Sequence, residues 1–144
     1  MNANSGISEL LSKDLIDPKD LLAEYEEFKD TREGLNADGI MDGSIELAVA
    51  LQKHYTVDEI VAVVAIGWHL NDLENLRIKG ETLINEDYFE AYVEQLAYDV
   101  APELESLTSW PERHFKLDVE AAAEEERQDY AEIEIDGVIL LYRA

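Results

Sequence analysis

The chain of 144 residues contains no cysteine. Without thiols it can form neither a disulfide nor a thiolate metal site, so an apolar core must hold its fold. Long apolar runs are also missing, because the longest, Ile60 to Ile66, is far below the roughly 20 residues of a membrane span. The N-terminus lacks the basic and apolar regions of a signal peptide. We therefore expect a soluble, cytoplasmic protein that does not contact a membrane.

Cations are scarce: 11 Lys and Arg stand against 34 Asp and Glu, for a net charge of -23. Because phosphate contacts need Lys and Arg, direct binding to DNA, RNA or anionic lipid is not expected. The hydrophobic fraction of 47% separates the chain from disordered acidic tails, which lack core residues. We expect one acidic domain over residues 1–144, with a helical part at 1–80 and a second part at 81–144.

Signatures of catalysis are missing as well. The histidines are His54, His69 and His114. They do not pair at metal spacing, and a site of His69 with Asp72 is less favoured than a helix-surface histidine. Asp38, Asp42 and Glu46 lack the residue order of a calcium loop. The many carboxylates offer no single candidate for acid–base work. We predict no enzyme activity, no metal and no cofactor; a small enzyme with unrecognised carboxylates is a third reading.

The first part is predicted to be helical. Asp17 before Pro18 is typical of a helix start, because Asp caps the helix and Pro suits its first turn. Apolar residues then recur on one stripe and acidic residues fill the rest, which predicts an amphipathic helix ending at Gly34 or Asn36. Ser44 is the expected N-cap of the next helix. Its inward positions would be Leu47, Val49, Ala50 and Leu51.

Thr56 and Glu59 have the spacing of a capping box, in which each side chain bonds to the backbone of the other residue. The run that follows, Ile60 to Ile66, is apolar nearly all round and predicts a central buried helix. Since its residues are mainly β-branched, a buried strand is the alternative. Trp68 is expected to anchor the core on a continuation of this helix, which Lys79-Gly80 would end.

A further acidic helix is predicted to open at Asn85–Asp87 and to end at Pro102. Trp110-Pro111 then marks a turn in the chain. These signals place a helix–turn unit directly before the C-terminal tail.

The tail predicts a capped helix and a β-hairpin. Asp118 is a good N-cap for an acidic helix. Tyr130 to Tyr142 reads as two strands around Asp136-Gly137, the residue pair that a type I′ turn favours. Lys79 to Ile84 could add a third strand, which the hairpin needs because two strands alone are marginal. The fold class is therefore α+β: about five helices packed with a C-terminal hairpin, or a small three-stranded antiparallel sheet.

The charge permits one specific function, imitation of DNA. A sphere of this chain length has a radius of gyration of roughly 14–15 Å, hence a diameter of about 37 Å. B-DNA carries about 22 negative charges over that length, close to the formal charge of -23. Such a body could occupy a cationic DNA-binding cleft. Acidity for solubility alone is the plainer interpretation.

The C-terminal part combines an aromatic turn, an acidic helix start and a closing hairpin. Its motifs are Trp110-Pro111, His114-Phe115, Asp118-Val119-Glu120-Ala121-Ala122-Ala123, Gly137-Val138-Ile139-Leu140 and Tyr142-Arg143. An acidic helix containing Asp87-Tyr88-Phe89 precedes them. Over residues 81–143 this arrangement resembles the C-terminal end of ArdA-type antirestriction proteins, which plasmids, transposons and phages carry, and of small phage proteins that share the ending. The chain departs from the family at Glu124, commonly Arg there, and at Val119, commonly aromatic.

The resemblance implies an inhibitor of type I restriction–modification enzymes, whose carboxylates imitate duplex phosphates. Its partner would be a protein with a basic DNA-binding groove, and a homodimer is a family trait. It would be encoded by a phage or mobile element and act in the host cytoplasm. The phosphate-mimicking row that we expect is Glu90, Glu94, Asp99, Glu120, Glu124 and Glu125.

The alternative function is a non-catalytic adaptor of phage or mobile-element origin, whose acidic helix Glu24 to Glu33 binds a basic partner. The readings differ in what they need from a structure. Mimicry needs carboxylates in a row on an elongated face, an enzyme needs a pocket around one or two of them, and an adaptor needs an exposed apolar patch of several hundred Å².

Overall fold

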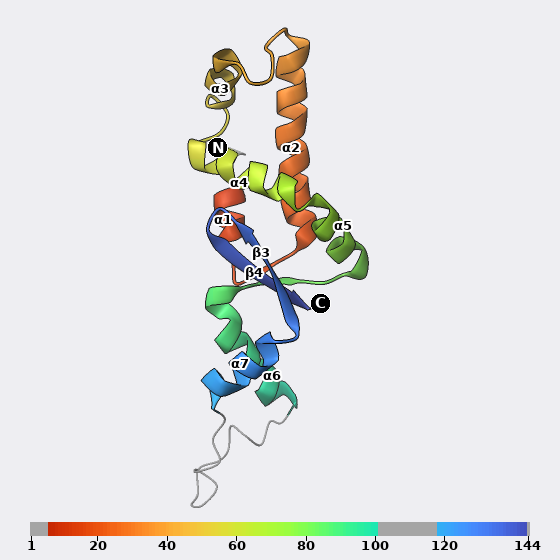
Figure 1. Cartoon of the computed structure of the whole chain (residues 1–144), viewed down its shortest axis with the longest axis vertical. Coiled ribbons are helices and arrows are strands. Elements are labelled where there is room, and N and C mark those ends of the chain that lie inside the picture. The colour runs from red at the N-terminus through yellow and green to blue at the C-terminus, as the bar shows by residue number, and fades with distance from the viewer. Residues whose placement is uncertain (1–5, 101–117, 144) are drawn as a thin grey trace, which may run out of the picture.

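The computed structural model describes residues 6–100 and 118–143, and these form an elongated molecule (Figure 1). In this part of the chain, seven α-helices and a four-stranded antiparallel sheet confirm the α+β class. The expected Trp110-Pro111 turn and the helix end at Pro102 lie outside the described residues. The helices are α1 (Gly6–Leu11), α2 (Pro18–Ala37), α3 (Ile45–Leu51), α4 (Val57–Trp68), α5 (Leu70–Lys79), α6 (Phe89–Val100) and α7 (Val119–Arg127), with a 3-10 turn η2 (Glu86–Tyr88) before α6.

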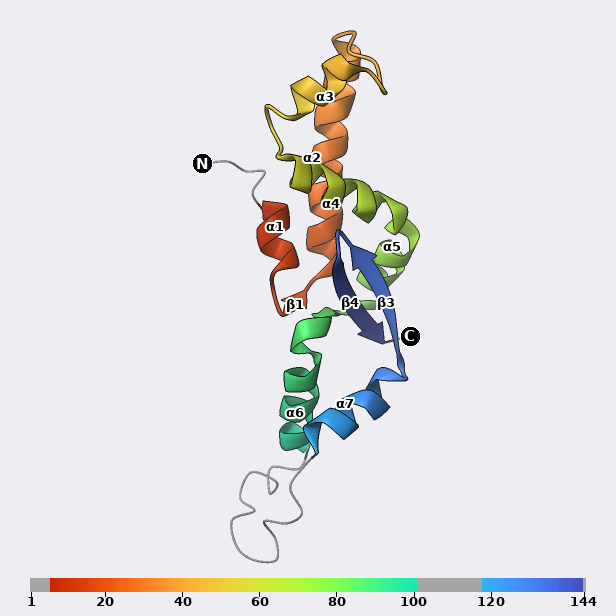
Figure 2. The ribbon, with the colours of Figure 1, turned by 60° about the vertical axis from the view of Figure 1, so that its left-hand side comes forward.

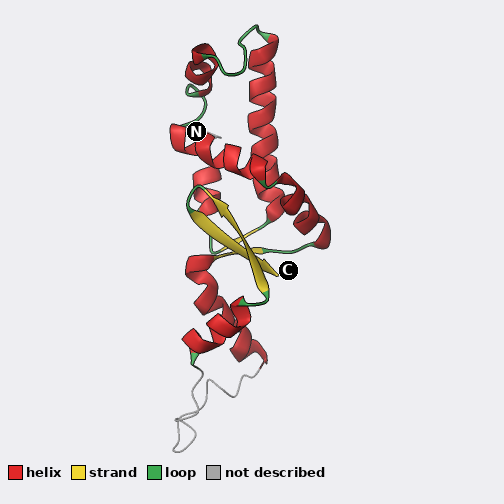
Figure 3. Ribbon diagram, in the orientation of Figure 1, coloured by secondary structure: helices red, strands yellow, loops and turns green. Residues whose placement is uncertain are grey.

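The sheet lies in the middle of the molecule (Figure 3). Its strands are β1 (Leu15–Ile16), β2 (Leu83–Asn85), β3 (Tyr130–Ile135) and β4 (Val138–Arg143), in the order β1-β2-β4-β3. The hairpin prediction is confirmed, since Asp136 and Gly137 have φ of 50° and 80°, both positive as a type I′ turn requires. A third strand also forms, as β2, but it begins at Leu83 because α5 continues to Lys79 and Gly80 caps it. The fourth, β1, was not predicted because two residues give no periodic signal.

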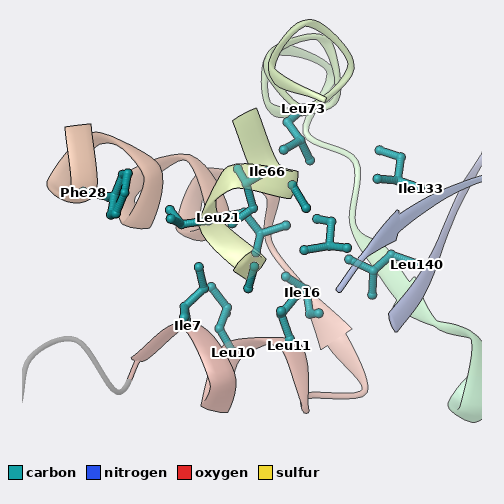
Figure 4. Packing of buried hydrophobic residues seen from close by; sticks show 14 of the residues in the cluster. Ile7, Leu10, Leu11, Ile16, Leu21, Phe28, Ile66, Leu73, Ile133 and Leu140 are labelled. Atoms are coloured by element: carbon teal, nitrogen blue, oxygen red, sulfur yellow. The ribbon is translucent and has the colours of Figure 1, made fainter. Parts of the chain in front are cut away.

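Both faces of β4 are covered, which explains its continuous apolar sequence. Leu140 is fully buried in a large cluster with Ile66 of α4 and Leu73 of α5 (Figure 4). Its neighbour Leu141 points the other way, because side chains alternate along a strand, and is buried in a small cluster with Phe89. The sheet therefore separates a large core under α1, α2, α4 and α5 from a small core under α6 and α7.

Helix α2 begins as predicted but ends later. The backbone N–H of Lys19 donates to Asp17 Oδ1 at 2.9 Å, with Pro18 in the first turn. The expected end at Gly34 or Asn36 is wrong, because the helix continues to Ala37. Gly34 inside the helix lowers stability by only about 0.5–1 kcal/mol relative to Ala. The packing of α2 on α4 and α5 offsets this loss.

The capping box at the start of α4 is confirmed. Thr56 Oγ1 accepts from the Glu59 N–H at 3.1 Å, and Glu59 Oε1 accepts from the Thr56 N–H at 2.9 Å. The segment is a helix, so the strand alternative is wrong. Gly67 suits the crossing with α2, since a Cβ there would lie 3.0 Å from Tyr25 Cε1.

The predicted central helix is buried on one face only, although its sequence is apolar nearly all round. Helical geometry places Val61, Val64 and Trp68 on the stripe opposite the buried positions, and they are 47%, 42% and 76% exposed. Trp68 is therefore not a core anchor, and the helix ends there rather than running on into α5. Val49 of α3, expected to point inward, is 54% exposed for the same reason.

Candidate functional site

The predicted acidic row falls on α6 and α7, which pack against each other at one end of the molecule (Figure 2). Local capping starts both helical segments. Asn85 Oδ1 accepts from the Asp87 N–H at 3.1 Å before η2, and Asp118 Oδ1 accepts from the Ala121 N–H at 3.1 Å before α7. Phe89 and Ala123 are buried between the two helices. This packing fixes the positions of the carboxylates on the outer faces of the two helices.

Three of the six expected carboxylates lie in one groove of about 260 Å³ between α6 and α7. They are Glu90, Glu120 and Glu124, all with exposed side chains. Glu86 and Asp87 line the same groove, although the sequence did not single them out. Segments about 30 residues apart in the chain thus contribute five carboxylates to one surface, a density that favours cationic groups.

The other three expected carboxylates do not join this groove. Glu125 lies on the opposite side of α7, in a second groove. Glu94 and Asp99 of α6 line neither of the two, and Asp99 Oδ1 accepts a hydrogen bond from Gln95 Nε2 at 3.0 Å. The six carboxylates therefore occupy several faces of the α6–α7 pair rather than one track.

A single arginine, Arg127, lines the acidic groove together with the five carboxylates. Its guanidinium lies 2.6 Å from Glu86 and 2.9 Å from Glu132 of β3. These contacts, the hydrogen bond to Glu86 first, raise the pKa of Arg127 above its ordinary value. The sequence could have singled out Arg127 as the one cation of α7, but its pairing with Glu86 needs the folded chain.

The elongated shape changes the charge comparison with DNA. A sphere of this chain length would match the charge per length of a duplex, whereas Figures 1 and 2 show a molecule much longer than it is wide. The net charge of -23 is therefore spread over a longer axis, and its mean density falls below that of a duplex. Only a local concentration of carboxylates can match the duplex, and the α6–α7 groove contains one.

A second carboxylate environment lies at α2. Glu24 lines a hollow of about 380 Å³ with Glu9, Lys13 and Asp20. Burial, and then the charges of neighbouring carboxylates, raise the pKa of Glu24 above its ordinary value. Among the described residues, Glu24 is the carboxyl group with a raised pKa.

The described residues contain no group of three or more His, Asp or Glu side chains placed to hold a metal ion. None of the helices in residues 6–100 and 118–143 combines the length and the apolar character needed to cross a membrane. Comparisons with protein-family models, with curated proteins and with solved structures gave no match.

Proposed function

We propose that the protein is a non-enzymatic inhibitor that occupies the duplex-binding groove of a DNA-binding defence enzyme, of which type I restriction–modification enzymes are the first candidates. One observation carries the proposal: five carboxylates from two helical segments line a single groove at one end of an elongated body with a charge of -23. The resemblance of residues 81–143 to antirestriction proteins points to the same class of target.

The mechanism is electrostatic. Lys and Arg side chains that normally contact phosphates would enter the groove beside Glu90, Glu120 and Glu124, and the enzyme would release its counterions. The field of the whole acidic body steers the encounter and raises the association rate. Arg127, held by Glu86 and Glu132, keeps part of the groove neutral and so limits repulsion among the carboxylates.

The test is a competition assay. A fluorescent duplex bound to a purified type I restriction–modification enzyme is titrated with the protein at several salt concentrations. We expect displacement that weakens steeply as salt rises. Replacing all six expected carboxylates of α6 and α7 by amides should weaken displacement by about tenfold or more, whereas single replacements should do little because the field is collective. The replaced residues are Glu90, Glu94, Asp99, Glu120, Glu124 and Glu125.

A matched control removes the same charge from the other end of the molecule. It replaces exposed carboxylates of α2 and the loop after it. They are Glu26, Glu27, Asp30, Glu33, Asp38 and Asp42. Equal loss in both variants would show that net charge alone matters. Loss in the control only would favour the adaptor reading with α2 as the contact, and failure of the unmodified protein to displace the duplex would refute inhibition.

A further inference from the structure

Helix α7 separates two grooves of different character. Its residues 120, 123, 124 and 127 line the acidic groove, and 122, 125 and 126, with Asp129 of the turn after the helix, belong to a second groove of about 410 Å³. Each set has the spacing of one helical face, and the two sets are offset by two residues, or about 200° around the helix. The second groove therefore faces away from the first.

The second groove has an apolar floor and an acidic rim. Its floor consists of Val93, Leu96, Ala97, Val100 and Ala122. Its charged lining residues are Glu125, Glu126 and Asp129, all acids. Leu96 and Val100 lie one turn apart on α6 and are 38% and 79% exposed. Apolar surface in contact with water is unfavourable by about 25 cal/mol per Å², so covering this floor would stabilise a complex.

The negative charge of the rim determines which kind of partner can bind over the apolar floor. Glu125 and Asp129 are exposed, while Glu126 has Arg143 at 3.9 Å as its ion-pair partner. A second copy of this chain would bring another charge of -23 against that rim and be repelled. A partner that carries Lys or Arg beside an apolar side chain satisfies both the floor and the rim.

We propose that this groove receives a leucine-sized apolar side chain from a segment of the target in which the flanking residues are Lys or Arg. The inference rests on the proposed function, because it assigns to the same target a second contact across α7. The acidic groove then supplies attraction that salt screens, and the apolar groove supplies binding that salt does not weaken. Together they distinguish a basic protein surface from small cations.

The test uses two fluorescent helical peptides as probes. One carries a stripe of Leu flanked by Lys; in the other, Gln replaces every Leu. At low salt both should bind, because both are cationic. At about 1 M salt, where the Debye length is about 3 Å, the Leu peptide should keep an affinity about ten- to a hundredfold above that of the Gln peptide, the gain from burying one such side chain.

Variants of the groove test whether the difference in affinity between the two peptides arises at α6. Replacing Leu96 and Val100 together by Asn should remove the high-salt advantage and leave low-salt binding of the Gln peptide unchanged. Val100→Asn alone, at a mostly exposed position, keeps the test usable if the double variant unfolds. Val61→Asn with Val64→Asn on α4 is the matched control, because it removes exposed apolar side chains elsewhere.

Three outcomes would overturn the inference. Loss of the advantage in the α4 variant instead would move the apolar contact to α4. Equal salt sensitivity of the two peptides would show that the groove takes no apolar side chain, while the charge-based function would stand if duplex displacement succeeds. Sedimentation showing a dimer of the unmodified protein and a monomer of the groove variant would make a second copy the occupant.

Discussion

The two sides of the sheet differ in the size of the core and in the surface charge that each core supports. On one side, α1, α2, α4 and α5 bury a large cluster that runs from Ile7 to Leu140. On the other side, a cluster of five buried residues supports α6 and α7. The side with the smaller core carries the acidic groove. The comparison suggests that the large core holds the fold while the small one positions charge.

The largest effect should come from the large core. Leu140→Ala removes a side chain with no exposed surface and should lower the free energy of unfolding by about 2–5 kcal/mol, the range for buried Leu→Ala changes. Urea denaturation followed by circular dichroism measures this loss. Loss of all helical signal in one transition at lower urea would support the large core as the part that holds the fold, whereas an unchanged urea midpoint would contradict that role.

Leu141→Ala, at the neighbouring residue and the opposite face, sharpens the comparison. Its loss should be smaller, about 2 kcal/mol, because fewer buried neighbours surround the cavity and they can move into it. Amide hydrogen exchange should accelerate first in α6 and α7, where local opening needs the least free energy. Equal loss and equal exchange patterns in Leu140→Ala and Leu141→Ala would show that the two clusters act as one core.

Thr56→Ala tests how much local capping adds to the large side. It removes the hydroxyl that accepts from the Glu59 N–H and should cost about 1 kcal/mol, typical of a lost N-cap. Thr56→Ser keeps the hydroxyl and is the control. Thermal unfolding of the three proteins measures the differences, and an alanine variant as stable as the serine variant would mean that the box does not stabilise α4.

The smallest effect concerns charge on the large side. Burial first, and then Glu27, Glu59 and Asp20, raise the pKa of Glu24. The folded state therefore binds this proton more tightly than the unfolded state. Its contribution to stability is present below the ordinary pKa of a glutamate and is lost as pH rises through the raised one.

Glu24→Gln should consequently gain stability relative to the unmodified protein as pH rises from about 4 to 7. Urea midpoints measured across this interval give the difference between the two proteins. Glu26→Gln, at an exposed site on the same helix, controls for the removal of one charge from an acidic chain. A difference for Glu24→Gln that stays constant with pH, or shrinks as pH rises, would be inconsistent with a raised pKa.

Features set by neighbouring residues could be predicted from the sequence. The capping box at Thr56, the caps at Asp17 and Asp118 and the turn at Asp136-Gly137 each depend on chemistry within a few residues. The third strand was predictable only in part: of the expected range 79–84, Leu83 and Ile84 lie in β2.

Features set by distant residues could not be predicted. An apolar stretch such as α4 does not reveal which of its faces will be packed, so the sequence predicts a core position for Trp68, which is 76% exposed. Strand β1 is defined by its pairing with β2, about 70 residues away. Sequence spacing likewise cannot bring Glu90 of α6 beside Glu120 of α7, or show which faces of the two helices border each groove. These depend on how two helices cross.

The exposed stripe of α4 bears on how the protein behaves in concentrated solution. Each molecule exposes an apolar stripe on α4 that could associate with the same stripe on another copy; it consists of Val57, Val61, Val64 and Trp68. Mutual repulsion keeps such stripes apart while the carboxylates are ionised, because like charge on every copy opposes close approach. Near the isoelectric point of about 4.1 that barrier disappears. Acidification should then cause aggregation through α4. The carboxylates that are proposed to bind a basic target therefore also keep the protein from aggregating.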